Sequence, residues 1–249
     1  MFDTHFHIID FRFPVRENQG FMPPSFPVDA YRERTRALGI TGGCVVSGSF
    51  QGFDTAFMLD ALAAFGPTFV GVVQIPASAS DDEIRRLDAA GVRGVRFNLV
   101  RGGSASIDEL DRLARRVHDL VGWHAELYAD ARDLEPIRIM LATLPALSIA
   151  HLGLSQAGFP TLLKLAEKGM KIKATGFGRV IDIDVPSALR ELANANPGSL
   201  MFGTDLPSQR ARRPFLPSDV DLIRESLDQS LWNKVFYENA LAFYRPRQT

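Results

Sequence analysis

The sequence predicts an α/β fold, a (β/α)8 TIM-type barrel, because eight short apolar runs alternate with amphipathic segments along the chain. Two further observations support this class. The chain has 249 residues, a length that such barrels commonly fill as one unit. It also has no stretch rich in proline, glycine and serine that would act as a linker. We therefore expect a single domain over residues 1–249.

The apolar runs are predicted strands, since each is short and rich in β-branched or aromatic residues. They cover residues 2–7, 43–47, 69–75, 92–99, 124–129, 147–151, 171–175 and 200–205. Helical periodicity marks the segments 28–38, 55–65, 81–90, 106–121, 162–168, 186–194 and 219–226. Two of these helices begin with a capping-box pattern, Ser80 with Glu83 and Ser106 with Glu109. Strands that alternate with helices favour parallel pairing through crossover connections.

A doubly wound open sheet is the alternative fold for this order of elements. Such a sheet usually carries a glycine-rich, phosphate-binding turn after its first strand. In this chain the corresponding place holds His5, Phe6 and His7. The residues at this turn therefore favour the barrel.

Alternation within the strands also fits a barrel, whose strand side chains point in turn toward the interior and toward the helices. In the first strand the mostly apolar set is Phe2, Thr4, Phe6 and Ile8, and the polar set is Asp3, His5 and His7. In the fourth strand Val95, Phe97 and Leu99 oppose Gly94, Arg96 and Asn98. We expect the mostly apolar sets to pack on helices and the polar sets to face the interior.

The composition is that of an ordinary globular enzyme, with 46% hydrophobic and 23% charged residues. Its 28 basic and 29 acidic side chains give a net charge of −1, which points to neither a nucleic acid nor a membrane as partner. The lone Cys44 lies in an apolar run and is expected to be a small buried side chain. No leader-like segment opens the chain, so we expect a cytoplasmic protein and leave a homo-oligomer open.

Polar side chains gather at the C-terminal ends of the predicted strands, where barrel enzymes place their active sites. They are His5, His7, Arg96, Tyr128, His151 and Asp205. Residues two apart on a strand share a face, so both imidazoles of the first strand can reach one metal ion or one substrate oxygen. Each residue alone has a structural explanation, such as a buried hydrogen bond or an ion pair. Their common position at strand ends favours a reaction centre. His118 and His124 stand apart from it, His118 as a solvated helix residue and His124 at the far end of the barrel.

Two of these segments, Asp3-Thr4-His5-Phe6-His7 and Gly203-Thr204-Asp205-Leu206-Pro207, resemble the first and eighth strand motifs of the amidohydrolase superfamily. Four others resemble, more narrowly, the 2-pyrone-4,6-dicarboxylate lactonase group. They are Gly20-Phe21-Met22-Pro23-Pro24, Gly94-Val95-Arg96-Phe97-Asn98-Leu99, the segment 123–128 and Ala150-His151-Leu152-Gly153. The similarity extends nearly over the whole chain.

This resemblance implies a hydrolase that opens a small carboxylated lactone, often without a metal. Asp205 is the expected base that activates water, and His5, His7 and His151 would polarise the carbonyl. Arg96 and Arg179 match the family's arginine positions and would bind the substrate carboxylate. Further hydrogen bonds to the anionic small-molecule substrate would come from Ser47, Ser49 and Tyr128.

A metal-dependent reaction is the first alternative, because His5, His7, His151 and Asp205 could form the shell of one Zn²⁺ ion. Such an enzyme would be a decarboxylase or an amide or ester hydrolase of the same superfamily. Glu126 could take the place of a further ligand, but the predicted seventh strand holds no histidine, which argues against two metals. We favour no metal and no other cofactor. The second alternative is an inert barrel that binds a small acid.

The chain also departs from the family pattern in two places. Leu206 and Ser208 flank the proline after Asp205, where relatives commonly have an aromatic residue and a histidine. Gly102 follows Arg101 where the dicarboxylate lactonases tend to carry another basic residue. We therefore expect a substrate with one carboxylate or none. Two long loops, 9–27 and 209–217, could cover the site. The second holds Arg210, Arg212 and Arg213, which could attract an anionic substrate, form a solvated surface or contact another subunit.

Overall fold

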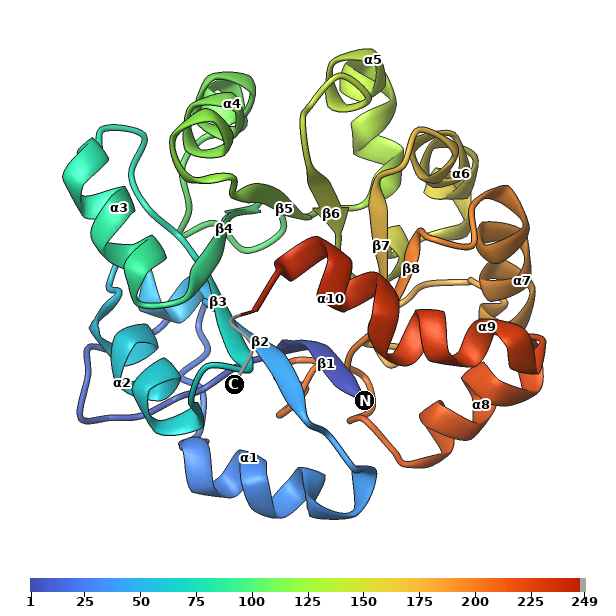
Figure 1. The fold of residues 1–249 in the computed structure, drawn as a ribbon, viewed down its shortest axis with the longest axis horizontal. Coiled ribbons are helices and arrows are strands. Elements are labelled where there is room, and N and C mark those ends of the chain that lie inside the picture. Colours follow the sequence, from blue (N-terminus) through green and yellow to red (C-terminus); the bar gives the residue numbers. More distant parts are fainter. Residues whose placement is uncertain (247–249) are drawn as a thin grey trace.

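The computed structural model has eight parallel strands that follow one another in chain order around a barrel, with helices on the outside (Figure 1). The strands are β1 Phe2–Phe6, β2 Gly42–Val46, β3 Phe69–Val73, β4 Val92–Asn98, β5 His124–Tyr128, β6 Leu147–Ile149, β7 Lys171–Ala174 and β8 Leu200–Phe202. The prediction of a (β/α)8 barrel is confirmed. The structure describes residues 1–246, so residues 247–249 of the expected domain lie outside the described part.

The gap between β8 and β1 is bridged by hydrogen bonds at and beyond the end of β8. The backbone N–H of Asp205 donates to the carbonyl oxygen of His5 at 2.7 Å, and that of His7 donates to Leu206 at 2.7 Å. The Thr4 hydroxyl adds a bond of 2.7 Å to the Phe202 carbonyl oxygen. These bonds place the segment after β8 directly beside His5 of β1 and His7, which follows that strand.

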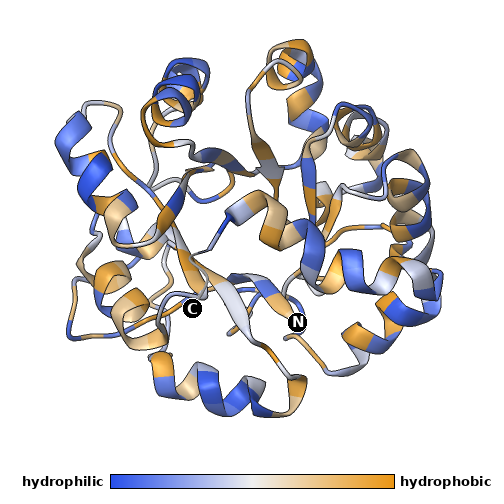
Figure 2. Cartoon of the chain, in the orientation of Figure 1, coloured by the Kyte–Doolittle hydropathy of each residue, from blue (hydrophilic) through white to orange (hydrophobic). Residues whose placement is uncertain are grey.

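Most of the helices lie around the barrel and pack apolar residues against it, and their ribbons carry both apolar and polar residues in Figure 2. They are α1 Val28–Thr35, α2 Ala56–Phe65, α3 Asp81–Ala89, α4 Leu110–Val121, α5 Arg138–Leu141, α6 Phe159–Glu167, α7 Val185–Ala195, α8 Ser218–Ser226, α9 Gln229–Asn233 and α10 Asn239–Tyr244. Ser80 caps α3 by accepting from the Glu83 N–H at 3.2 Å, as expected. None of the helices within residues 1–246 has the length and apolar character that a membrane crossing requires.

Several predicted element ends are wrong, and the backbone explains why. Predicted strands reached His151 and Asp205, but β6 ends at Ile149 and β8 at Phe202. His151 and Asp205 have φ angles of 53° and 60°, in the left-handed region that an extended strand cannot contain. Ser106 accepts from the Asp108 N–H and not from Glu109, because a 3₁₀ turn precedes α4. Both functional candidates therefore follow their strands and do not end them.

The predicted alternation in β1 is wrong at its start because the register against β2 shifts between Asp3 and Phe6. Phe2 was expected to face the surrounding helices, but it stacks on Tyr244 of α10, the helix that crosses one end of the barrel. Asp3, expected to face the interior, accepts a hydrogen bond from the Tyr31 hydroxyl of α1 at 3.0 Å. A bulge adds a residue to one strand and reverses the side-chain faces on either side of it. Beyond it the alternation holds, with Phe6 stacked on Tyr31 and with His5 and His7 inside.

Helix α10 crosses the end of the barrel opposite the strand ends that carry the site (Figure 1). Tyr244 contacts Phe2 from β1 and His124 from β5, with ring centroids 5.7 and 5.2 Å apart. The position of His124 at this far end is as expected. The sequence did not predict α9 and α10, because they are short. It also did not predict the helical segment 131–141, which contains Pro136. Helix α10 therefore covers the end of the barrel that lies opposite the site.

Candidate active site

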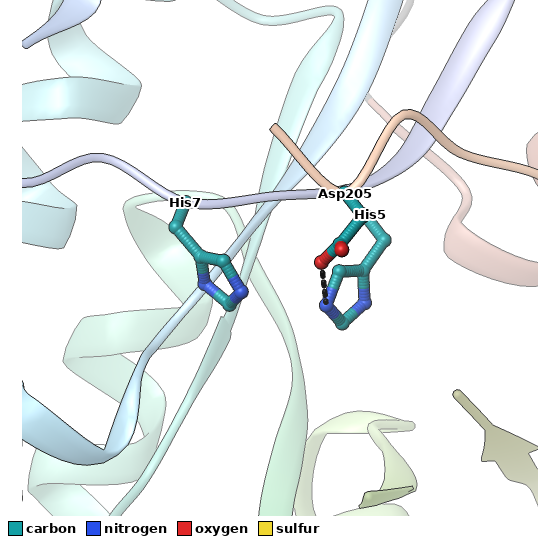
Figure 3. A group of neighbouring side chains, drawn as sticks. All are labelled: His5, His7 and Asp205. Atoms are coloured by element: carbon teal, nitrogen blue, oxygen red, sulfur yellow. Dashed lines mark ion pairs between the residues drawn. The ribbon is translucent and has the colours of Figure 1, made fainter. Parts of the chain in front are cut away.

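His5 of β1 and His7, just after it, point the same way, and Asp205 approaches them from the segment after β8 (Figure 3). Each of the three residues offers a nitrogen or oxygen atom, and these atoms lie within 4.8 Å of one another. An oxygen atom placed among them would be about 2.8 Å from each, which is hydrogen-bond distance. All three side chains are buried. The group can therefore hold one small ligand atom away from bulk water.

His151 completes the cluster from the turn after β6. Its Nε2 lies 3.9 Å from Oδ1 of Asp205, and its ring centroid lies 4.7 Å from that of His5. The ring packs against Gly176, where an added Cβ would come within 2.3 Å of Nδ1 of His151. Gly176 also has a φ of 63°, which favours glycine. The close approach of this loop fixes the position of the third histidine.

Four charged side chains surround the histidines: Arg96, Glu126 and Lys173 are buried, and Arg179 is half-buried. Arg179 donates from Nε to Oδ2 of Asp205 at 2.6 Å, so only Oδ1 of that carboxylate remains without a hydrogen-bond partner among the described residues. Arg96 donates to the Ser47 carbonyl oxygen at 2.6 Å, and its Nε lies 3.4 Å from Glu126. Lys173 of β7 donates to the other oxygen of Glu126. With Asp205 these groups amount to three cations and two carboxylates.

The hydrogen bonds to the rings fix which nitrogen carries the proton in His5 and His7. The ammonium of Lys173 has donors and no acceptor, and it lies 3.3 Å from Nδ1 of His5. Nδ1 of His5 is therefore the acceptor, and the proton of the neutral ring is on Nε2. In His7, Nδ1 faces the Val46 carbonyl oxygen at 2.7 Å and must carry the proton. The two Nε2 atoms are thus a donor in His5 and an acceptor in His7.

Burial sets the protonation states of the cluster. It lowers the pKa of His5, His7 and His151 well below the ordinary histidine value, and neighbouring cations lower each pKa further. The rings are therefore neutral at neutral pH. Burial also raises the pKa of Asp205, an effect that Arg179 partly offsets. A carboxylate with a raised pKa beside neutral imidazoles is suited to accept a proton.

A cavity that is open to solvent lies above these groups. It is lined by His7, Phe21, Gly48, Ser49, Phe50, Arg96, Asn98, Arg101, Tyr128, His151, Arg179, Gln209 and Arg210. Of the expected substrate-binding residues, Arg96, Arg179, Ser49 and Tyr128 are among the lining residues. Ser47 is fully buried and contributes its backbone carbonyl to Arg96.

A family model described as Amidohydrolase matches residues 2–245. The chain belongs to the amidohydrolase family. This amidohydrolase is a hydrolase similar to lactonases, and its barrel and its resemblance to the dicarboxylate lactonase group are as the sequence predicts.

Two relatives and one solved structure illustrate the similarity. The chain is 28% identical to a 4-sulfomuconolactone hydrolase from Hydrogenophaga intermedia, over 91% of this chain and 81% of that protein. It is 27% identical to a 2-pyrone-4,6-dicarboxylate hydrolase from Comamonas testosteroni, over 99% and 90%. The structure of a 2-pyrone-4,6-dicarboxylic acid hydrolase homologue from Pseudomonas putida superposes with a TM-score of 0.84 at 25% identity, covering 98% of this chain and 97% of that one.

The structure of this amidohydrolase brings His5, His7, His151, Asp205, Arg96 and Arg179 together as expected. Two residues that the sequence did not single out also belong to the site: Lys173, which bonds His5, and Arg101, which lines the cavity. Arg210, one of the arginines of the loop 209–217, lines the cavity as well. The signal for Lys173 was present, because alternation along β7 puts residues 171, 173 and 175 on one face. His118, expected to be solvated, is half-buried and bonds the Trp123 carbonyl oxygen through Nδ1 at 3.1 Å.

Proposed function

We propose that this protein hydrolyses a small carboxylated lactone, with Asp205 as the base that takes a proton from the attacking water. The observation that carries the proposal is the asymmetry of the Asp205 carboxylate. Oδ2 is bonded to Arg179, whereas Oδ1 has no partner among the described residues and faces His5 at 4.0 Å and His151 at 3.9 Å. An oriented lone pair beside neutral rings is what deprotonation of water requires.

The ring tautomers assign the remaining roles. A water that donates to Oδ1 of Asp205 and to Nε2 of His7 would be held by two acceptors, with one lone pair directed at the substrate. His5 would donate from Nε2 to the lactone carbonyl oxygen as negative charge develops there. His151 lies beside His5 and would share this role. The water oxygen bonds to the carbonyl carbon, the ring C–O bond breaks, and the released oxygen takes the proton from Asp205.

The charge of the site favours an anionic substrate. The site has three positive charges, on Arg96, Lys173 and Arg179, and two negative charges, on Glu126 and Asp205. Arg96 and Arg179 reach the cavity, and the Arg96 guanidinium lies 5.3 Å from the centre of the Tyr128 ring. Guanidinium groups bind carboxylates in a bidentate manner. Two of the relatives are named for lactones or pyrones that carry acidic groups, in agreement with this preference.

By position, His5, His7 and Asp205 could hold one divalent ion. A Zn²⁺ ion bound there would act as a Lewis acid on the carbonyl or on water. The neighbouring groups argue against it. A zinc-bound histidine normally donates its second nitrogen to a carbonyl or carboxylate, as His7 does with Val46. His5 instead accepts from Lys173, Glu126 is paired with Lys173, and Asp205 is paired with Arg179. We propose that the reaction does not depend on a metal.

A screen of lactones with and without a chelator tests this proposal. Purified protein is assayed against carboxylated and neutral lactones and against muconate-type acids, before and after metal depletion, with metal content measured in parallel. We expect hydrolysis of carboxylated lactones that depletion leaves unchanged. Activity that is lost on chelation and restored by Zn²⁺ would support the metal-dependent alternative. Ligand binding without turnover of any lactone or acid would support the inert barrel.

A further inference from the structure

One buried carboxylate near the site has no role in the proposed reaction. Within residues 1–246 four acidic side chains are buried, and three of them, Glu126, Asp205 and Asp219, are paired with a lysine or an arginine. The fourth, Asp3 of β1, has no cationic partner in that part of the chain and does not line the cavity. Burying a charge costs free energy, and at Asp3 only hydrogen bonds from neutral groups offset this cost.

Four hydrogen bonds from three parts of the chain converge on Asp3. Its Oδ1 accepts from the backbone N–H groups of His5 at 3.2 Å and Thr204 at 2.8 Å. Its Oδ2 accepts from the Tyr31 hydroxyl of α1 at 3.0 Å and from the Thr204 hydroxyl at 2.6 Å. A carboxylate accepts on both oxygens, whereas an amide accepts on only one atom. Asp3 therefore joins β1, α1 and the segment after β8 through a single side chain.

The segment that contains Thr204 also contains the proposed base. The Thr204 hydroxyl accepts from the Leu206 N–H at 3.2 Å, and the Asp205 N–H donates to the His5 carbonyl oxygen at 2.7 Å. The backbone N–H groups of residues 204, 205 and 206 are thus all bound to β1, either directly or through the Thr204 hydroxyl. Asp205 has a φ of 60°, a conformation that residues other than glycine keep where the surrounding structure holds them. These bonds supply that constraint.

Asp3 bonds the backbone on both sides of the gap between the base and His5. Across this gap, Oδ1 of Asp205 lies 4.0 Å from Nε2 of His5 (Figure 3). The two segments are in direct contact, because a Cβ added at Gly203 would lie 2.9 Å from the backbone nitrogen of His5. A displacement of a catalytic group by about 1 Å can lower a rate about a hundredfold. The bonds to Asp3 therefore bear on turnover as well as on the fold.

We propose that Asp3 is a positioning residue for Asp205: acting through Thr204, it holds the backbone of residues 204–206 so that Oδ1 of Asp205 faces His5. The inference rests on the proposed function for the role of Asp205 as the base. The Tyr31 hydroxyl binds the same oxygen of Asp3 but comes from α1. Its loss would leave the bonds from Asp3 to His5 and Thr204 in place, so Tyr31→Phe is the matched control.

Three variants separate positioning from a purely structural role. Thr204→Val removes the hydroxyl and keeps the shape of the side chain, Thr204→Ser keeps the hydroxyl, and Tyr31→Phe removes the other hydroxyl bond to Asp3. Kinetics on a carboxylated lactone are compared at equal folded fraction, with calorimetric titration of benzoate, a non-reactive ring acid, as the measure of binding. We expect Thr204→Val to lower kcat about tenfold or more, with KM and benzoate affinity changed less than about twofold. Thr204→Ser should recover most of the lost kcat.

Tyr31→Phe should lower the stability in urea and keep the wild-type kcat, because it removes a hydrogen bond to a buried carboxylate but none to the segment after β8. If Thr204→Val does not fold, Asp3→Asn takes its place, since the amide leaves the Thr204 hydroxyl without an acceptor, and the same fall in kcat is expected. A wild-type kcat in Thr204→Val, an equal fall in Tyr31→Phe, or a loss of benzoate affinity as large as the loss of kcat would overturn the inference.

Hydrogen exchange at the backbone amides of Asp205 and Leu206 tests the same bonds without any turnover. Thr204→Val should speed exchange at both amides, and Tyr31→Phe should not. If wild type hydrolyses no lactone but exchange behaves as expected, the positioning stands and the proposed reaction is wrong. If lactones are hydrolysed and Asp205→Asn is inactive, while Thr204→Val keeps the wild-type kcat, the reaction stands and the positioning is wrong.

Discussion

Lys173 places three hydrogen-bond donors inside the barrel, and each has an acceptor. They reach Glu126, the Thr4 carbonyl oxygen at 2.7 Å, and Nδ1 of His5 at 3.3 Å. The last bond keeps the proton of His5 on Nε2, which faces Asp205. Lys173 is therefore a positioning residue for the histidine that would polarise the carbonyl. It acts through another side chain and does not itself line the cavity.

Removal of this ammonium should impair turnover more than binding. Lys173→Met alone would leave the Glu126 charge buried with a weaker partner, so the double variant Lys173→Met/Glu126→Gln is the better test. We expect kcat to fall about tenfold with little change in KM, because His5 no longer has a fixed donor on Nε2. Nitrogen-15 spectra of the histidine rings should show a gain of the Nδ1–H form of His5. An unchanged tautomer together with a reduced kcat would contradict this role.

Arg96 is expected to bind the substrate carboxylate directly. Replacement by methionine keeps the length of the side chain and removes the charge. Arg96→Met should raise KM for carboxylated lactones, with a loss in kcat/KM of about thirtyfold, since hydrogen bonds to charged groups contribute roughly 1.5–3 kcal/mol. Kinetics on matched neutral lactones provide the control. Equal losses on neutral and carboxylated lactones would show that Arg96 acts on the fold of the site and not on the carboxylate.

At this scale the sequence predicts positions better than contacts. His5, His7, His151 and Asp205 could be placed together because parallel strands end on one face of a barrel. The partners of each ring could not be predicted. Lys173 and Glu126 lie 47 residues apart, and only the closed barrel brings them together. The role of Asp3 was likewise hidden, since a one-residue bulge turns its side chain toward α1.

At the scale of elements, the segments after the strands hold the site in an unusual backbone conformation. His151, Leu152, Leu154 and Asp205 all have positive φ angles. Such residues are uncommon outside glycine and persist where the surrounding structure holds them. The eight strands and most of the helices follow from periodicity in the sequence. These turns do not, because periodicity stops where the chain leaves the strand, and the predicted strands consequently ran too far.

Gly176 offers a test of how the loop after β7 positions His151. A methyl group there would press on Nδ1 of His151 and would place alanine at a φ of 63°. Gly176→Ala should destabilise the fold by about 1 kcal/mol or more and lower kcat by moving the ring. Gly169→Ala is the control, because its φ is 90° but no atom lies within 4 Å of the added Cβ. Equal effects of the two changes on kcat, compared at equal folded fraction, would contradict the contact with His151.

For the whole molecule, the barrel could be predicted from the order of elements, but its closed end could not. The helix α10 contributes Tyr244, which packs on Phe2 and His124 across the end opposite the site. Its sequence is too short to show a clear helical period. Gly94 leaves room there, since an added Cβ would lie 2.5 Å from the His124 ring. The barrel interior thus holds four buried histidines, three at the site and one at the closed end.

These histidines should make the protein sensitive to acid. Burial lowers the pKa of all four, that of His124 to about 3, whereas the unfolded chain titrates near 6.5. Below pH 6.5 the unfolded state therefore binds more protons than the folded state. As the pH is lowered, the free energy of unfolding decreases by up to about 1.4 kcal/mol per pH unit for each ring. Asp3, whose pKa burial raises to about 6, works in the opposite direction between pH 6 and 4.

Urea unfolding at several pH values separates these contributions. His124→Gln should flatten the dependence of the free energy of unfolding between pH 6.5 and 4 by about 1 kcal/mol per pH unit. Ser148→Ala is the control, a buried change without a titrating group, and should shift stability by the same amount at every pH. A pH dependence in His124→Gln that matches wild type would show that His124 is not held neutral in the fold.

The central claim is that Asp205 activates water without a metal, and the most direct measurement is the single-turnover rate of metal-depleted Asp205→Asn on a carboxylated lactone. The amide keeps the shape of the side chain but cannot accept a proton. We predict a rate 10² to 10⁴ lower than that of metal-depleted wild type, which is about the usual contribution of a general base, with benzoate affinity retained. A variant that turns over the lactone at the wild-type rate would contradict the account.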